Sequence, residues 1–210
     1  MLQPVSGSIR ALSGRRPLML DVSNNNPISG AQLAASGAVA LVCKATEGSS
    51  FVDNTYTAHR ELARAHRIPF GGYLFLHPSS PGNEAQFFLE HATPAAGDVQ
   101  PWIDAEVRDG ASFAQVAARV DSCAQVLEAA GYRPLLYSYT SFLQGLLVAR
   151  TTLRRLRVVQ AGYTRVRPRV GHGASVVAWQ NTDRLPAAGG HFDGSRLLVP
   201  LESLLIGAAR

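Results

Sequence analysis

Cysteine and lysine are scarce in this chain. Two cysteines, Cys43 and Cys123, occur in 210 residues, and neither has a histidine or another cysteine nearby at the spacing of a zinc site. A disulfide framework and a zinc site are therefore excluded, and we expect both thiols to be buried as small apolar side chains. Lys44 is the only lysine among 20 basic residues, so the formal net charge of +5 rests on arginine.

Long apolar runs are also absent. No stretch approaches the roughly 18 apolar residues that a membrane-spanning helix needs, and residues 1–20 lack the apolar core of a secretory signal. We therefore expect no membrane span and no general secretory route.

The sequence has no nucleic-acid motif and no basic stripe with interleaved aromatic residues, which argues against nucleic-acid binding. The positive charge favours attraction to anionic polymers such as those of a cell wall.

The residues that are present fit one compact domain with a sizeable core, since 46% of them are hydrophobic. Short apolar runs alternate with helical periodicity, which is typical of β/α units around a mostly parallel sheet. We predict strands over residues 18–22, 39–45, 70–75, 101–106, 135–138, 158–161, 176–180 and 191–193. We predict helices over 54–67, 83–92 and 112–130, the last capped by Ser112 and ended by Gly131.

The helical signal fades after residue 150, and strands then follow one another through turn-rich links. This order favours an α/β barrel, with regular β/α units first and mostly β structure last, over an open sheet. No long linker divides the chain, so we predict a single barrel over residues 17–210. Residues 1–16 precede the first strand, and we predict for them either an attachment arm or a loosely packed terminus.

Four acidic residues fall at the carboxyl ends of predicted strands, where barrel enzymes gather their catalytic groups. They are Asp21, Asp104, Glu106 and Asp193. Residues two apart on a strand point to the same face, roughly 6.5–7 Å apart, so Asp104 and Glu106 would share one site. Repulsion and partial burial would let one keep a proton while the other stays a base, as glycosidic cleavage requires. Because an Asp-x-Glu pattern is common, there is an alternative: one of the two residues faces solvent at a bulge, or both form salt bridges.

Several short motifs accompany this pair. They are, in order, Asp21-Val22-Ser23, Lys44-Ala45-Thr46-Glu47-Gly48, Gly71-Gly72-Tyr73, Ile103-Asp104-Ala105-Glu106, Leu136-Tyr137-Ser138, Ala161-Gly162-Tyr163, Ala178-Trp179-Gln180 and a late Asp193. The series resembles the glycoside hydrolase family 25 lysozymes, the Chalaropsis-type muramidases of phage endolysins and bacterial autolysins. The resemblance covers about residues 17–205 and implies an irregular TIM-like (β/α)5(β)3 barrel that cleaves the β-1,4 bond between N-acetylmuramic acid and N-acetylglucosamine.

The resemblance also implies a role for each carboxylate. Glu106 would be the general acid, and Asp104 would orient the acetamido group of the substrate for attack on the anomeric carbon. Direct attack by a carboxylate is the alternative, which the sequence does not separate from substrate assistance. Asp21 and Asp193 would form the acidic floor of the groove. No metal or cofactor is implied.

Sugar binding needs flat apolar faces beside hydrogen-bonding groups. Four aromatic residues at predicted strand ends offer both, with core or rim positions as the alternative for each: Tyr73, Tyr137, Tyr163 and Trp179. Glu47 either reaches the groove or has a structural role opposite Lys44.

The sequence departs from the family pattern at a few positions. Asn26 stands where many members carry Gln, Leu74 where His is frequent, and Asn181 where an aromatic residue is usual, while residues 158–160 lack a common Trp. Because all four carboxylates remain, these changes bear on substrate preference more than on activity. The histidines show no pairing with a nucleophile, and we predict surface or turn positions for His77, His172 and His191.

The sequence therefore predicts a peptidoglycan muramidase. Without a secretory signal it would be a phage endolysin that waits in the host cytoplasm, or a lysin carried on a virion and attached to other virion proteins through residues 1–16. The alternative of a different class is a non-catalytic glycan-binding or structural protein that retains the barrel.

Overall fold

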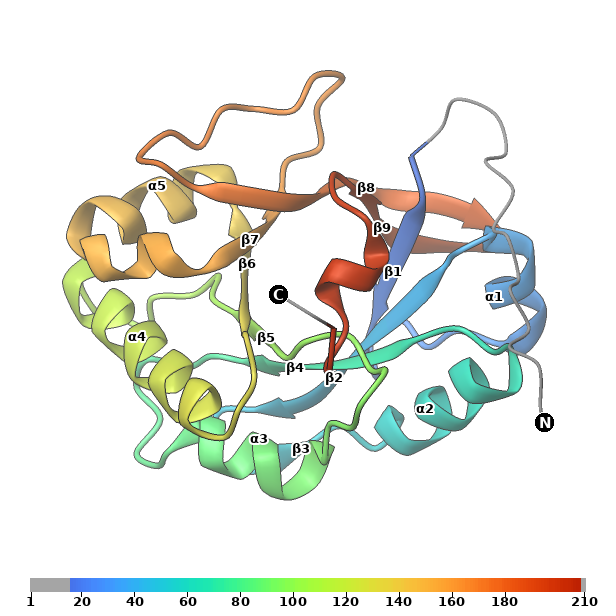
Figure 1. Ribbon diagram of the computed structural model, residues 1–210, viewed down its shortest axis with the longest axis horizontal. Coiled ribbons are helices and arrows are strands. Elements are labelled where there is room, and N and C mark those ends of the chain that lie inside the picture. Colours follow the sequence, from blue (N-terminus) through green and yellow to red (C-terminus); the bar gives the residue numbers. More distant parts are fainter. Residues whose placement is uncertain (1–15, 209–210) are drawn as a thin grey trace, which may run out of the picture.

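The structure, a computed structural model, describes residues 16–208, and its centre is a closed barrel of eight strands (Figure 1). The strands of the barrel are β1 (Leu18–Val22), β2 (Ala40–Glu47), β4 (Phe70–Phe75), β5 (Trp102–Asp104), β6 (Leu135–Tyr139), β7 (Arg157–Ala161), β8 (Ser175–Ala187) and β9 (Gly190–Leu197). Neighbours from β1 through β2 and β4 to β8 pair in parallel. Strand β9 closes the barrel and pairs antiparallel with both β8 and β1. A short strand, β3 (Phe51–Val52), folds back on β2.

The helices lie outside the barrel, and each follows a strand (Figure 1). They are α1 (Gly30–Ser36), α2 (Tyr56–Ala65), α3 (Glu84–Ala92), α4 (Phe113–Ala129) and α5 (Thr140–Ala149). A 3-10 turn, η1 (Thr151–Arg155), precedes β7, and a second, η2 (Leu201–Leu204), follows β9. The prediction of a mixed α/β barrel is confirmed. No helix within residues 16–208 is long and apolar enough to cross a membrane.

Helix α4 forms as its sequence predicts. Ser112 accepts a hydrogen bond from the backbone N–H of Gln115, whose side chain accepts one from the Ser112 backbone, so two free donors of the first turn are satisfied. The residues at spacings of three and four are buried against the barrel, among them Val116, Val120 and Leu127. Gly131 has φ +90°, which suits glycine at a helix end.

The structure differs from the predicted elements at several places. Helices α1 and α5 were not predicted: the first has only seven residues, and the second is apolar on nearly every side. The last strand is longer than residues 191–193, because Gly190–Leu197 pairs with both of its neighbours. The predicted strand 101–106 ends at Asp104, so Glu106 lies beyond the strand and not on it.

Two apolar clusters hold the fold together. One fills the inside of the barrel and contains Met19, Trp102 and Leu135, and the other lies between the barrel and the helices. Turn η2 covers the end of the barrel where the parallel strands begin: Leu204 is fully buried, and its carbonyl accepts a hydrogen bond of 2.8 Å from the Gln100 N–H. Polar residues occupy the opposite end of the barrel, where the parallel strands finish.

Two further predictions concern the cysteines and the N-terminus. Cys43 and Cys123 are buried free thiols, as predicted. Nearly all of the predicted arm, residues 1–15, lies outside the described residues.

Candidate active site

The four predicted carboxylates meet at the end of the barrel where the parallel strands finish. Asp21 on β1 stands directly opposite Asp193 on β9. Asp104 is the last residue of β5, and Glu106 follows two residues later. Each of the four has a raised pKa, and charge repulsion from another acidic residue contributes in every case, which places them in one electrostatic cluster.

Asp104 is the most isolated of the four from water and from hydrogen bonds. Its residue is 7% exposed, and its Oδ1 is buried without a hydrogen-bond partner among the described residues. Burial raises the pKa of Asp104 well above its usual range, the charges of Glu106 and Asp21 raise it further, and Lys44 acts in the opposite direction. A carboxyl in this position tends to keep its proton.

Glu106 lies in a pocket of about 520 Å³. The other residues around this pocket come from the ends of β6 and β7 and the segments after them, including Tyr139, Thr140 and Tyr163. Burial raises the pKa of Glu106, the Tyr137 hydroxyl opposes this effect, and the charge of Asp193 adds to it. Glu106 is therefore a carboxyl with a raised pKa in contact with an open groove.

Asp21 and Asp193 line a second pocket, of about 310 Å³, together with Tyr73 and Asn26. Burial raises the pKa of Asp21, as does the charge of Asp193, while hydrogen bonding from Gln180 lowers it. Burial also raises the pKa of Asp193 to about 6, against a hydrogen bond of 3.2 Å that the Asn26 amide donates to its Oδ2. The sequence had marked Asn26 only as a departure from the family pattern.

Gln180 connects these groups, and sequence reasoning missed it as a site residue. Its buried amide Nε2 donates to both carboxylate oxygens of Asp21, at 3.0 Å each. Its Oε1 accepts hydrogen bonds of 2.8 Å from the hydroxyls of Tyr137 and Tyr163. Because every partner fixes the orientation of the amide, Gln180 holds Asp21 and both tyrosines in one geometry. The sequence signal that could have identified it is its place in the motif Ala178-Trp179-Gln180, at the end of the predicted strand 176–180.

The predicted sugar-binding aromatics have different positions. Tyr163 is 53% exposed and lines the larger pocket, and Tyr73 lines the smaller one. Tyr137 is buried and meets the site through its hydroxyl. Trp179 lines neither pocket, and its indole N–H donates to the Gly162 carbonyl at 2.8 Å.

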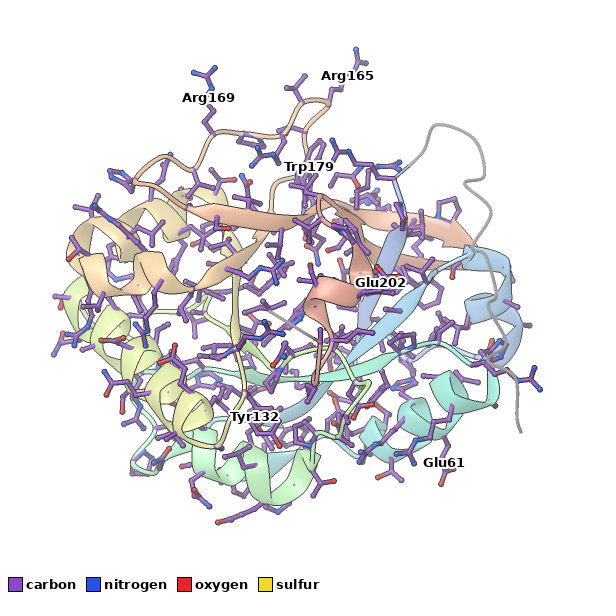
Figure 2. The ribbon with its side chains drawn as sticks, viewed as in Figure 1. Glu61, Tyr132, Arg165, Arg169, Trp179 and Glu202 are labelled. Carbon is purple, nitrogen blue, oxygen red and sulfur yellow. The ribbon has the colours of Figure 1, made fainter. Side chains whose placement is uncertain are left out.

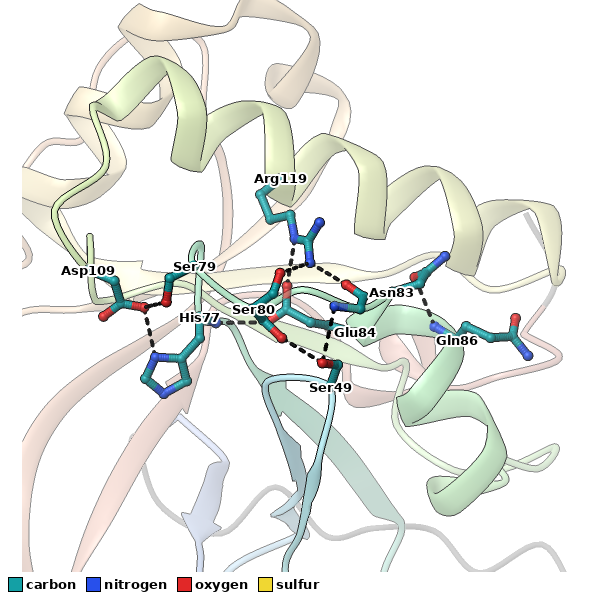
Figure 3. Close-up of polar contacts among 10 residues, drawn as sticks. Ser49, His77, Ser79, Ser80, Asn83, Glu84, Gln86, Asp109 and Arg119 are labelled. Atoms are coloured by element: carbon teal, nitrogen blue, oxygen red, sulfur yellow. Dashed lines mark hydrogen bonds and ion pairs between the residues drawn. The ribbon is translucent and has the colours of Figure 1, made fainter.

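Glu47 lies between Lys44 and His77. Its carboxylate lies 2.7 Å from the Lys44 ammonium and 3.0 Å from His77 Nε2, and it lines neither pocket. His77 lies in the segment after β4, partly exposed as predicted, and its Nδ1 is 2.8 Å from Asp109, so it bridges two acidic residues. Figure 3 draws the contact with Asp109. His172 and His191 are exposed, as predicted.

Contacts with Glu84 and Arg119 fix the segment after β4 that carries His77 (Figure 3). Fully buried Glu84 accepts the His77 backbone N–H at 2.8 Å and pairs with Arg119 of α4 at 2.9 Å. Arg119 also donates to the carbonyls of Ser80 and Gly82. These contacts hold the rim of the site beside Glu47. Among residues 16–208 there is no group of three or more His, Cys, Asp or Glu side chains that would hold a metal ion.

A closed α/β barrel that gathers carboxyls of raised pKa at the ends of its strands has the features of a barrel glycosidase. The sequence model of Glycosyl hydrolases family 25 matches residues 20–190. The chain therefore belongs to glycosyl hydrolase family 25.

Individual relatives agree with this assignment. The chain is 30% identical over 148 residues to an autolytic lysozyme of Clostridium acetobutylicum, a match that covers 70% of this chain and 44% of that protein. It spans less than half the length of the curated relatives that it matches. The fold is similar to a bacterial lysozyme of Streptomyces coelicolor, with a TM-score of 0.82, 19% identity and coverage of 92% and 97% of the two chains. A family 25 glycosyl hydrolase of Bacillus anthracis gives a TM-score of 0.79 at 20% identity, with coverage of 91% and 93%.

Proposed function

We propose that the protein is a muramidase that hydrolyses the β-1,4 bond between N-acetylmuramic acid and N-acetylglucosamine in bacterial peptidoglycan. The observation that carries the proposal is the pair Asp104 and Glu106, two neighbouring carboxyls whose pKa values burial raises. A carboxylic acid that keeps its proton beside a second carboxyl suits cleavage of a glycosidic bond. Family membership, and the match to an autolytic lysozyme, support the choice of bond.

Glu106 is the proposed general acid, because it faces the larger pocket and can reach a sugar oxygen there. Asp104 keeps 7% of its surface exposed, and the acetamido N–H of a bound sugar would donate a hydrogen bond to its carboxylate there. Such a bond stabilises the ionised form and lowers the pKa of Asp104, which leaves the proton of the pair on Glu106. The acetamido oxygen, held by the same contact, would then attack the anomeric carbon as the glycosidic C–O bond breaks and Glu106 gives its proton to the leaving oxygen. Water, losing a proton to Glu106, would then open the oxazolinium ion and complete the hydrolysis.

The two pockets suggest where the sugars on either side of the cut bond lie. Tyr163 and Glu106 line one pocket, and Tyr73, Asp21 and Asp193 line the other. Asp104 ends β5, which lies between β4, the strand of Tyr73 in the smaller pocket, and β6, the strand of Tyr139 in the larger one. A glycan strand that filled both would pass its scissile bond over the carboxylates. Asp21, fixed by Gln180, and Asp193, held by Asn26, would form the floor of that groove.

The test is digestion of purified peptidoglycan, followed by borohydride reduction to identify the sugar at each new reducing end. We expect new muramitol with the wild type and a rate about 10²–10⁴-fold lower with Glu106→Gln, the range that loss of a general acid gives. The matched control is Glu61→Gln, whose side chain points away from the molecule on α2 (Figure 2) and should leave the rate unchanged.

New glucosaminitol would instead show that the enzyme cuts a different bond from the one proposed. A folded wild type that released no reducing ends from several kinds of wall would favour the non-catalytic glycan-binding protein. Full activity in Glu106→Gln would remove this residue from the mechanism.

The finer description of the fold, an irregular TIM-like (β/α)5(β)3 barrel over residues 17–210, also belongs to this proposal. The chain order supports it, with five strands each followed by an α-helix before β7, β8 and β9. A phage origin, as an endolysin or as a virion lysin, stays a prediction from the sequence. Lysis of cells from outside by the purified protein, compared with lysis from within after a membrane pore is opened, would test how it reaches the wall.

A further inference from the structure

The β7–β8 loop, residues 162–174, forms one rim of the larger pocket, which Gly162, Tyr163, Thr164 and Pro168 line. Two glutamine side chains, one on β7 and one on α5, fix the backbone of the loop. The Gln160 amide donates to the Pro168 carbonyl at 2.9 Å, and the Gln144 amide donates to the Arg169 carbonyl at 3.2 Å. The loop is therefore held in place beside Glu106 by contacts that leave its charged side chains free.

Those side chains are arginines without acidic partners. Arg165, Arg167 and Arg169 are exposed, and Figure 2 shows Arg165 and Arg169 extending from the loop away from the barrel. No ion pair joins any of the three to an acidic side chain within residues 16–208, which include every Asp and Glu of the sequence. The one side-chain contact found there for Arg167 is a hydrogen bond of 3.3 Å to Gln160.

The loop also encloses a pocket of its own, of about 300 Å³. Arg167, Arg169 and His172 line it, and Gly171 and Gly173 there adopt positive φ. Pro168 lies between the two arginines and lines the larger pocket, so a single turn of backbone separates the cationic pocket from the groove that holds Glu106.

We propose that the cationic pocket binds a carboxylate of the peptide carried by the muramic acid, and so makes the enzyme prefer glycan with free peptide carboxylates. The inference rests on the proposed muramidase activity. Peptides attached to a strand in the groove must leave it across a rim, and guanidinium groups recognise carboxylates with two parallel hydrogen bonds. The carboxyls of the site that are ionised repel an anionic substrate, and arginines at the rim offset this repulsion.

The test compares two substrates and three proteins. One substrate is peptidoglycan freed of phosphate polymers, and the other is the same material with its carboxylates converted to amides by carbodiimide and ammonia. The proteins are the wild type, the double variant R167Q/R169Q, and the control R64Q/R154Q, which removes two exposed arginines of α2 and η1 and has the same net charge. The rate of new reducing ends is measured at low substrate concentration.

We expect amidation to slow the wild type about threefold to tenfold, the effect of one or two partly exposed ion pairs. R167Q/R169Q should be slower by a similar factor on the native substrate and indifferent to amidation, while R64Q/R154Q behaves as the wild type. An equal loss in R167Q/R169Q on both substrates would overturn the proposal. The assay is repeated on walls that retain their phosphate polymers, and a loss in R167Q/R169Q confined to those walls would also overturn the proposal and assign the pocket to a phosphodiester.

Failure of the underlying activity would look different, since the wild type would then release no reducing ends from either substrate. Co-sedimentation with the two insoluble walls at fixed salt still tests the pocket in that case. The wild type should sediment with the native wall more than R167Q/R169Q does, and equal sedimentation would refute carboxylate binding.

Discussion

Asp193→Asn should stabilise the fold at neutral pH. The pKa of Asp193 is raised from 3.8 to about 6 by burial and by the charge of Asp183, so the folded protein carries this carboxylate at a cost when it is ionised. A shift of about two units corresponds to roughly 3 kcal/mol at 1.36 kcal/mol per unit. Because the side chain is partly exposed and solvent screens its charge, we expect about 1–2 kcal/mol. Asparagine keeps an oxygen to accept the Asn26 hydrogen bond.

The sign of the pH dependence follows from proton linkage. Between pH 3.8 and about 6 the folded protein holds a proton at Asp193 that the unfolded chain has released, so this residue lowers stability as the pH rises through that window. Asparagine resembles the protonated form at every pH. The difference between variant and wild type should therefore be near zero below pH 4 and reach its full value above pH 6. Asp21 adds to the effect with the same sign, since the charge of Asp193 raises its pKa.

Thermal unfolding followed by circular dichroism at several pH values between 4 and 7.5 measures this difference. For a chain of this size, about 1–2 kcal/mol raises the melting temperature by about 2–8 °C. Glu61→Gln is the control, and it should leave the melting temperature unchanged at both pH 4 and pH 7.5. A melting temperature at pH 7 equal to or below that of the wild type, or a gain that persists at pH 4, would refute the electrostatic reasoning.

Three further predictions concern catalysis and packing. Glycan cleavage should decline as the pH rises through the raised pKa of Glu106, because the acid loses its proton; a kcat/KM profile flat to pH 9 would contradict this. Asp121→Asn should cost about 3 kcal/mol at pH 7 in urea unfolding, because buried Asp121 pairs with two arginines and its pKa is lowered; the cost should vanish in acid, where the wild type is protonated too. Gly145→Ala should cost about 1–3 kcal/mol, because a Cβ there would lie 2.6 Å from the Phe113 ring, and an unchanged urea midpoint would show that α4 and α5 separate easily.

The sequence predicted the elements whose signals are local. The barrel strands are short apolar runs, and α4 shows both its caps and its helical spacing, so each could be located without knowledge of its neighbours. Helix α5 was missed although its buried residues, Phe142, Leu143, Leu146 and Leu147, have helical spacing, because the segment is short and contains Gly145. The length of β9 depends on two partners at once, β8 and β1, and pairing partners leave no local pattern.

The site shows the same division. Asp21, Asp104 and Glu106 are visible because they come at or just after the end of an apolar run, whereas Asp193 lies inside β9. Gln180 and Asn26 are not visible in this way, because what they do depends on residues more than a hundred positions away: Gln180 bonds to Asp21, and Asn26 bonds to Asp193. The sequence left the role of Glu47 open; its carboxylate contacts Lys44 and His77, and its charge also raises the pKa of Asp104.

The position of β9 has a consequence for how the chain comes to be made. This strand joins β8 to β1, so until residues 190–197 leave the ribosome, two strand edges stand open and Asp193 is missing from beside Asp21. Open edges pair readily with other chains, and contacts between distant parts of a sequence form slowly. A product cut short before residue 190 should therefore aggregate instead of giving a weak enzyme. The four carboxyls come together only when β9 enters the barrel and brings Asp193 beside Asp21.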